Sequence, residues 1–160
     1  MSWKVMSRMP PTVVSDATCI IALHRIGRLD ILERLYHAIH IPPAVRREVS
    51  IVDEDWIRVE PVRKPEIVQG LRYILDEGES EAIALATDLP DAILITDDRK
   101  ARKIAFEFDL KITGTIGVLL LAWRLGIILD LEKEIDKLSQ TGFHMTPELK
   151  QEALRLMHQK

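Results

Sequence analysis

The sequence predicts an α/β fold with a mostly parallel sheet. Short apolar stretches of strand length alternate along the chain with segments whose apolar residues recur at helical spacing. The chain has 160 residues, of which 47% are hydrophobic and 29% are charged. This length and composition favour a single globular domain over residues 1–160, and they exclude wholesale disorder and a fibrous repeat.

Five stretches have the composition of short strands. The first is a β-branched run that ends at Asp16, and the second is stopped by Pro42-Pro43. The third alternates apolar and polar residues, which predicts an edge strand or one arm of a hairpin. The predicted strands are Thr12–Ser15, Ala38–Ile41, Trp56–Val62, Ala92–Thr96 and Leu110–Thr113.

The segments between these strands are predicted to be helices. Ala17–Tyr36 divides into two helices at Gly27, and the proline pair before Ala44 starts the next helix. A break near Gly78 separates two further helices, and Thr146 is a predicted N-cap. The remaining predicted helices are Pro65–Leu75, Glu79–Thr87, Arg99–Phe108, Thr115–Leu125, Asp130–Ser139 and Pro147–His158.

The charge and the cysteine content limit the cellular compartments and the partners that we expect for this chain. The net charge is −3, so the whole molecule has no positive field that would attract nucleic acid or an acidic membrane. The single cysteine, Cys19, cannot close an internal disulfide, which favours a reducing cytoplasm. The longest apolar run, Ile116–Leu129, contains Arg124 and is shorter than the roughly 20 residues that span a bilayer. We therefore expect a cytoplasmic protein without a membrane segment.

Acidic side chains fall at the ends of two predicted strands. Asp16 follows the first strand and Asp97-Asp98 follow the fourth, while Glu48 and Glu81 lie on helices that flank the same edge. Ligand sites of parallel sheets lie beyond the carboxyl ends of the strands. Gathered carboxylates repel one another unless a cation neutralises them, and oxygen ligands without Cys or His select Mg²⁺ or Mn²⁺. The spacing therefore indicates a metal site.

Each of these acids also has a purely structural interpretation. Asp16 or Asp98 alone is typical of a helix cap or an Asx-turn, and Glu48 alone is typical of a solvated helix residue paired with a neighbouring arginine. Glu79 and Glu81 could simply favour a helix N-terminus through its dipole. Only the coincidence of these acids at strand ends favours the functional interpretation.

A basic run, Arg99–Lys103, directly follows the acidic pair. Its four cations oppose the dipole of the helix that they open. They form either a solvated face or a grip on a phosphate backbone beside the acidic pair. The histidines show no paired-ligand spacing and are interpreted as surface or core residues. They are His24, His37, His40, His144 and His158.

Four segments, in the correct order, resemble the motifs of PIN-domain nucleases. A fifth segment, Ile112–Leu119, resembles a strand-to-helix stretch common in the VapC-like toxin branch. The resemblance covers about Val13–Leu129 and leaves 130–160 as a helical C-terminal extension. The four segments are Val13–Thr18, Ile41–Val49, Gly78–Ala86 and Leu94–Arg102.

The resemblance implies a three-layer α/β/α domain with a mostly parallel sheet of about five strands. It implies an acidic pocket that binds Mg²⁺ or Mn²⁺ and cleaves RNA as an endoribonuclease. Many such proteins are toxins of toxin–antitoxin pairs and form homodimers, so the expected partners are RNA, an antitoxin protein and a second copy of the chain. No membrane partner is expected.

The resemblance also implies roles for individual residues. Asp16 is the principal metal ligand, and Glu81 with Asp97 or Asp98 completes the set, the residues leaving the choice between the two open. Glu48 is a further ligand or orients the attacking water. In addition, Arg99 and Arg102 position the RNA backbone, and Thr96 or Thr115 holds a ligand water.

Two other functions remain as alternatives. One is a non-catalytic PIN-like module that binds RNA or a protein, which the negative net charge favours. The other is a phosphoryl-accepting, receiver-like domain, which also places an acidic pair at strand ends. That domain needs a lysine after a late strand, where this chain has Gly114-Thr115.

Overall fold

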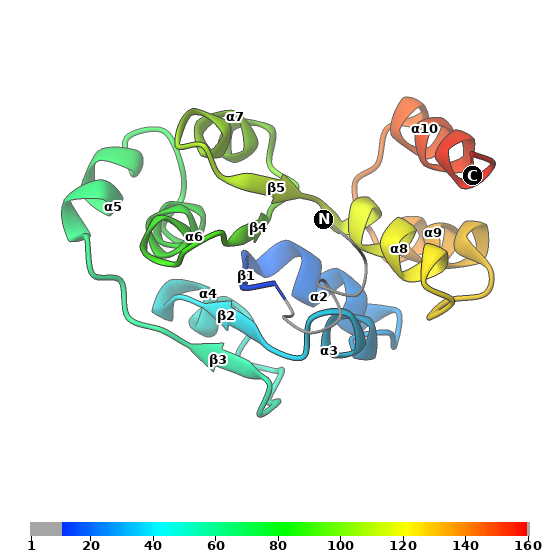
Figure 1. Ribbon diagram of the computed structural model, residues 1–160, viewed down its shortest axis with the longest axis horizontal. Coiled ribbons are helices and arrows are strands. Elements are labelled where there is room, and N and C mark those ends of the chain that lie inside the picture. The colour runs from blue at the N-terminus through cyan, green and yellow to red at the C-terminus, as the bar shows by residue number, and fades with distance from the viewer. Residues whose placement is uncertain (1–10, 160) are drawn as a thin grey trace.

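A computed structural model describes residues 11–159 of the chain. Residues 1–10 and 160, which the predicted domain also includes, lie outside the described part. Within it, alternating strands and helices form an α/β fold with one parallel sheet (Figure 1). The predicted fold class is therefore confirmed.

Five short strands form the sheet within residues 11–159. They pair in the order β3-β2-β1-β4-β5, and every neighbouring pair is parallel. The third strand is an edge strand, as predicted, but it pairs in parallel with β2 and so is not the arm of a hairpin. The strands are β1 (Val13–Ser15), β2 (Ile39–Ile41), β3 (Ile57–Val59), β4 (Ile93–Ile95) and β5 (Lys111–Thr113).

The helices come between and after the strands in the order that was predicted. The first two helices are separated by a turn in which Gly27 has a φ of +72°, a conformation that glycine adopts without strain. The helices are α2 (Ala17–Arg25), α3 (Asp30–Tyr36), α4 (Pro43–Glu48), α5 (Pro65–Leu71), α6 (Glu77–Asp88), α7 (Arg99–Glu107), α8 (Thr115–Arg124), α9 (Leu131–Gln140) and α10 (Pro147–Met157).

The break predicted near Gly78 lies slightly earlier in the chain. Helix α6 begins at Glu77, and Asp76 caps it by accepting a hydrogen bond from the Glu79 amide at 2.7 Å. The Glu79 carboxylate in turn accepts from the Asp76 amide at 3.2 Å, which completes a capping box. Gly78 is therefore inside the first turn of α6, where two satisfied amides outweigh its low helix propensity.

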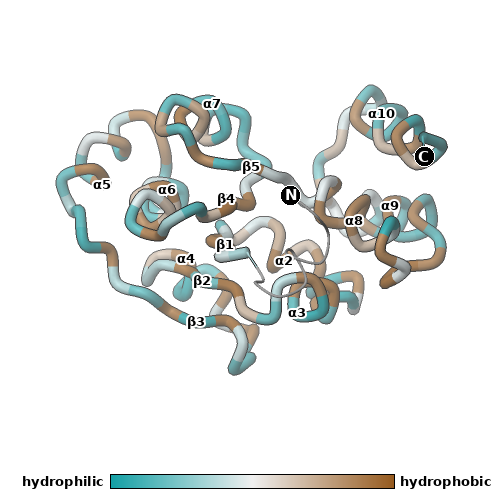
Figure 2. The backbone as a smooth tube through the Cα atoms, in the orientation of Figure 1, coloured by the Kyte–Doolittle hydropathy of each residue, from teal (hydrophilic) through white to brown (hydrophobic). Residues whose placement is uncertain are grey.

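The sheet is buried between two groups of helices. Val13 and Val14 of β1 are fully buried and belong to separate apolar clusters, because successive side chains of a strand point to opposite faces. One cluster joins the sheet to α2, α3, α8 and α9, and the other joins it to α5, α6 and α7. Figure 2 shows hydrophobic segments along the central strands and hydrophilic segments on outer turns and helices.

The C-terminal helices pack onto the body of the domain. Leu131, Ile135 and Leu138 of α9 are fully buried in the same cluster as α2 and α8, and Ala153 of α10 joins them. Figure 1 shows α8, α9 and α10 side by side at one end of the molecule. Within residues 11–159, every helix is too short or too polar to cross a bilayer.

The order of the strands reverses its direction between β1 and β4. From β1 the chain moves outward through β2 and β3, and it then returns to place β4 on the other side of β1. Ligands of such sheets bind beyond the carboxyl ends of the strands at this switch point. The residues that follow β1 and β4 are Asp16 and Thr96-Asp97-Asp98.

Candidate active site

Asp16 is held at the switch point by its own backbone and by helix α2. Its amide donates to the Ile95 carbonyl of β4 at 3.0 Å, which continues the β1–β4 pairing by one residue. Its carboxylate caps α2 by accepting from the Thr18 amide at 3.2 Å. The residue is only 4% exposed. Asp16 is therefore the N-cap of α2, and this cap fixes its buried carboxylate at the edge of the sheet.

The buried Asp16 carboxylate has an unusual affinity for protons. Burial raises its pKa from the ordinary 3.8 to about 7, and the negative charges of Asp97 and Glu79 add to the rise. Hydrogen bonds with Thr96 and Thr18 offset part of this effect. Near neutral pH, this position thus favours either a proton or another cation.

Asp97 is fixed by the first residue of α8. One carboxylate oxygen accepts from the Thr115 amide at 2.8 Å, and the other accepts from the Thr115 hydroxyl at 2.6 Å. Asp98 has a different partner, because it caps α7 by accepting from the Ala101 amide at 2.8 Å. Thus Asp97 is held by α8, the helix that follows the neighbouring strand β5, whereas Asp98 is held by α7, the helix that it caps.

Glu79 brings a further carboxylate to the same region. Burial raises its pKa to about 7, and the charges of Asp76 and Asp98 contribute to the rise. Its charge also adds to the rise in the pKa of Asp16. The sequence analysis interpreted Glu79 only as a residue near a helix N-terminus. The Asp76–Glu79 spacing of a capping box would have predicted that the helix begins at this point and that Glu79 lies in its first turn.

Three of these acids line a cleft of about 440 Å³, whereas the buried Asp16 is not among its lining residues. Glu79, Asp97 and Asp98 form one side of it, and Thr18, Ile21, Ala22 and Arg25 of α2 form another. The remaining wall is Thr141–His144, the turn that follows α9. The C-terminal extension therefore contributes to the cleft, which sequence reasoning did not predict. His144 is exposed, as expected of a surface histidine, and it also lines this cleft.

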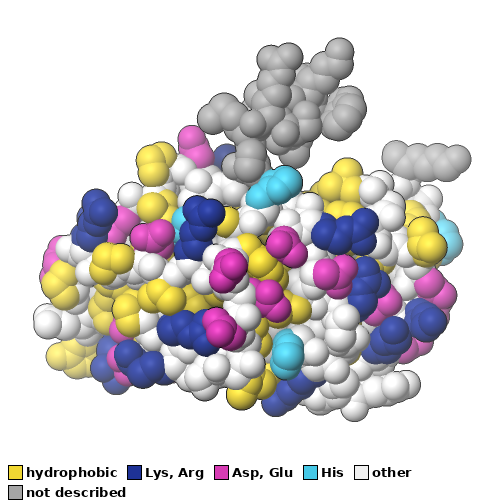
Figure 3. Space-filling view, turned by 90° about the horizontal axis from the view of Figure 1, so that it is seen from below, with side chains coloured by type: hydrophobic (Ala, Val, Ile, Leu, Met, Phe, Trp, Pro, Cys, Tyr) yellow, Lys and Arg dark blue, Asp and Glu magenta, His cyan; other side chains and the backbone are white. Residues whose placement is uncertain are grey.

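The basic residues of the run Arg99–Lys103 in α7 have different surroundings. Arg102 donates to the Thr96 carbonyl at 3.0 Å, so it stabilises the end of β4. A Cβ on Gly114 would lie 2.7 Å from the Asp97 carboxylate and 2.8 Å from the Arg102 guanidinium, so glycine is required there for both to approach. Arg99 and Lys100 are exposed. On the face seen in Figure 3, basic side chains are interspersed with acidic and hydrophobic ones, without one continuous basic surface.

A model of a known family matches nearly the whole chain. The family, DUF3368, is described as a PIN domain, and its model matches residues 12–159. The chain belongs to this PIN-domain family. The match includes the C-terminal helices, beyond the span of about 13–129 over which the motif resemblance extends. Among curated proteins, none matches the sequence of this chain.

Two further acids predicted as site residues contact other groups of this PIN domain. The Glu81 carboxylate accepts a hydrogen bond from the Ala44 amide at 3.0 Å, so it satisfies the first turn of α4. The Glu48 carboxylate packs against Gly78, and burial together with the charges of Asp76 and Glu77 raises its pKa. Neither residue lines the cleft, and the same is true of Asp16. The ligand roles of Glu48 and Glu81 stay predictions, and Glu79 is an additional acid that lines the cleft.

The carboxylates of the PIN-domain cleft are turned toward hydrogen-bond donors. Within residues 11–159, no group of three or more His, Cys, Asp or Glu side chains is arranged to hold a metal ion. Over the same residues, none of Asp16, Glu79, Asp97 and Asp98 forms an ion pair with a basic side chain. In the described part of the chain, the cleft thus contains several carboxylates that form no ion pair, and its lining arginine, Arg25, is not paired with any of them.

Proposed function

We propose that this PIN domain is an Mg²⁺- or Mn²⁺-dependent endoribonuclease. The observation that carries the proposal is Asp16, which is 4% exposed, lies beside other acids and has no cationic partner within residues 11–159. A fold tolerates such an uncompensated buried carboxylate when a bound cation offsets its desolvation. PIN domains are typically nucleases, which supports the same proposal.

The chemistry of the donors, rather than their present arrangement, suits a hard divalent cation. All of the candidate ligands are carboxylate oxygens, which Mg²⁺ and Mn²⁺ prefer over sulfur or imidazole. Asp97 and Glu79 of the cleft, together with Asp16, whose pKa their charges raise, would hold the ion, with Asp98 completing the set directly or through water. Each hydrogen-bonded oxygen retains a second lone pair, so the existing caps leave acceptor capacity for a cation.

A bound divalent ion would supply a nucleophilic water near neutral pH and stabilise negative charge on a phosphodiester. The residues of this chain orient the carboxylates and contact the RNA. Thr115 fixes the Asp97 carboxylate, and Thr96 and Thr18 orient that of Asp16. The exposed Arg99 is available for the RNA backbone, whereas Arg102 acts first on the end of β4.

The toxin role and the assembly are part of the proposal. We propose that the protein is the toxin of a toxin–antitoxin pair and forms a homodimer, on the basis of its motif resemblance to that branch. Leu121, Leu125 and Leu129 on and after α8 are exposed apolar side chains that support a protein contact. Sedimentation of the purified chain, alone and with the product of any adjoining gene, tests both points.

The decisive experiment compares metal binding and RNA cleavage in matched variants. Calorimetric titration with Mn²⁺ and cleavage of a labelled single-stranded RNA are measured for the wild type, Asp16→Asn and the exposed control Asp53→Asn. We expect the wild type and the control to bind Mn²⁺ and to cut RNA, and Asp16→Asn to lose both activities while remaining folded. Cleavage that survives in Asp16→Asn or in EDTA would contradict the proposal.

The non-catalytic alternative makes the opposite prediction for the wild type. The lack of a preassembled metal group within residues 11–159 favours it. Under this alternative, the wild-type protein binds RNA or a protein partner without retaining Mn²⁺ at millimolar concentration. It then leaves the RNA intact.

A further inference from the structure

The wall that the C-terminal extension gives to the cleft is a rigidly built turn. Gly142 follows α9 with a φ of +92°, which glycine adopts without strain. The Phe143 amide reaches back to the Leu138 carbonyl at 3.2 Å, and the Phe143 ring packs on the main apolar cluster. This is the hydrogen-bond pattern of a Schellman C-cap with its usual hydrophobic contact. The turn therefore presents His144 in a defined position.

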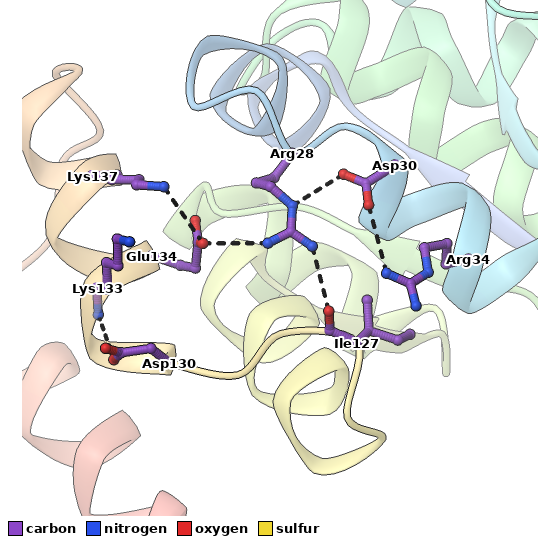
Figure 4. A network of polar contacts seen from close by, with 8 residues as sticks. All are labelled: Arg28, Asp30, Arg34, Ile127, Asp130, Lys133, Glu134 and Lys137. Atoms are coloured by element: carbon purple, nitrogen blue, oxygen red, sulfur yellow. Dashed lines mark hydrogen bonds and ion pairs between the residues drawn. The ribbon is translucent and has the colours of Figure 1, made fainter.

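Helix α9, which carries this turn, is tied to the α2–α3 region by a polar network (Figure 4). The Arg28 guanidinium donates to the buried Glu134 of α9 at 3.3 Å and to the Ile127 carbonyl at 3.4 Å. Arg28 also pairs with Asp30 at the start of α3. These contacts fix the helix that ends at the cleft relative to the helix that forms the opposite wall.

Arg25 on that opposite wall is free to bind a ligand. It is the last residue of α2, it is exposed, and within residues 11–159 its side chain has no hydrogen bond or ion pair. Ile21 and Ala22 are each three or four residues from both Thr18 and Arg25, so the four residues share one face of α2. At 1.5 Å per residue, Arg25 lies about 10 Å along the helix from Thr18, beyond the acidic end of the cleft.

The α2 side of the cleft therefore has two chemically different ends. Asp16, which caps α2 beside Thr18, marks an acidic end, and Arg25 marks a basic end. His144 also lines the cleft, and an arginine and a histidine suit an anion. Ile21 and Phe143 add apolar surface to the same cleft. A single-stranded nucleic acid matches this combination, because it carries regularly spaced phosphates and unstacked bases that pack on apolar side chains.

We infer that Arg25 and His144 bind a phosphate of the RNA that flanks the one at the acidic end of the cleft. The inference rests on the proposed nuclease function and adds a substrate-binding role for the C-terminal extension. The guanidinium of Arg25 supplies a forked pair of donors, and His144 supplies a ring N–H from the opposite wall. Because neither residue is one of the proposed metal ligands, we expect both to act on RNA binding and not on metal binding.

The test separates RNA binding from metal binding with matched variants. Arg25→Gln is compared with Arg124→Gln, since Arg124 is likewise an exposed last residue of a helix, and His144→Ala is compared with the exposed His158→Ala. Anisotropy of a labelled single-stranded RNA gives Kd in EDTA and in Ca²⁺ over a series of salt concentrations. Mn²⁺ calorimetry and steady-state cleavage kinetics are measured on the same proteins.

We expect Arg25→Gln and His144→Ala each to raise Kd and KM by about 5- to 10-fold, with kcat within about twofold and Mn²⁺ affinity unchanged. Arg25→Gln should also reduce the slope of log Kd against log salt concentration by about 0.7. Both controls should match the wild type.

Two results would overturn the inference, and they are distinguishable. If the wild type binds Mn²⁺ and cuts RNA while the cleft variants behave as their controls do, only the roles of Arg25 and His144 are refuted. If the wild type neither binds Mn²⁺ nor cuts RNA, the proposed nuclease function fails and this inference fails with it.

Discussion

Thr115 holds both carboxylate oxygens of Asp97, one through its amide at 2.8 Å and the other through its hydroxyl at 2.6 Å. Thr115 is the first residue of α8, and Gly114 at its N-cap has no side chain with which to cap the helix. Asp97 therefore caps α8 from the end of β4, and its negative charge is favourably placed at a helix N-terminus. One pair of hydrogen bonds thus joins the fold to the candidate metal site.

Replacing Thr115 by valine should weaken metal binding more than it weakens the fold. Thr115 is fully buried, and valine has nearly the same shape but lacks the hydroxyl that donates to one oxygen of Asp97, while its amide can still donate to the other. We expect Thr115→Val to lower Mn²⁺ affinity by about 10-fold and to cost about 1 kcal/mol of unfolding free energy. Calorimetry and urea unfolding check the two effects. Thr115→Ser keeps the hydroxyl and should restore Mn²⁺ affinity, and a serine variant as weak as the valine variant would contradict this role.

Removing the charge of Asp16 should stabilise the metal-free protein. Asparagine keeps the N-cap of α2 but carries no buried charge. The pKa of Asp16 is about 7 in the folded protein and near 3.8 when unfolded, so between about pH 4 and pH 7 the folded state retains a proton that the unfolded state has lost. Stability therefore falls as the pH rises through this window, and it does not recover above pH 7.

We expect Asp16→Asn to gain about 2 kcal/mol at pH 8 in EDTA, and less at pH 5, where the wild-type carboxyl is protonated in the folded state. Thermal melts at both pH values measure the difference, with Asp53→Asn as the exposed control. Mn²⁺ should raise the melting temperature of the wild type but not that of Asp16→Asn. An equal gain at pH 5 and pH 8 would show that burial of this charge is not the cause.

Glu79 and Glu81 should differ in their effect on metal affinity. Glutamine is nearly isosteric with glutamate and can still accept the hydrogen bond in each case, so both substitutions remove mainly the charge. We expect Glu79→Gln to lower Mn²⁺ affinity by about 10-fold and Glu81→Gln to leave it unchanged, because Glu79 lines the cleft and Glu81 faces Ala44. Mn²⁺ calorimetry on both variants decides the point, and the reverse order would restore Glu81 as the ligand.

Alanine at Gly142 should disturb both the fold and the cleft. The φ of +92° at this position is strained for any residue with a Cβ, so we expect Gly142→Ala to cost about 1 kcal/mol and to lower the melting temperature by about 3 °C. A displaced turn should also weaken RNA binding. Gly70→Ala in α5 is the matched control, since open space surrounds its Cβ position and alanine favours a helix there. Equal destabilisation by both substitutions would contradict this explanation.

The sequence was sufficient for the order of elements and for the acids at the strand ends. Short apolar runs and helical spacing gave the five strands and their intervening helices with small errors at the ends. Asp16 directly follows β1 and Asp97-Asp98 come one residue after β4, and residues so close to a strand end stay at that edge of the sheet whatever the packing of the helices. For this reason their location was predictable from a local pattern.

The tertiary structure decided which helical acid faces the cleft and what forms its far wall. Glu79 and Glu81 are two residues apart on one helix, so they point in nearly opposite directions, and only the packing of α6 selects the one that lines the cleft. Likewise, Thr141–His144 reaches the cleft only because α9 folds back against α2 and α8 and Arg28 binds Glu134. Local spacing determines the type of element and the residues at its ends, but helix rotation and long-range contacts depend on the whole core.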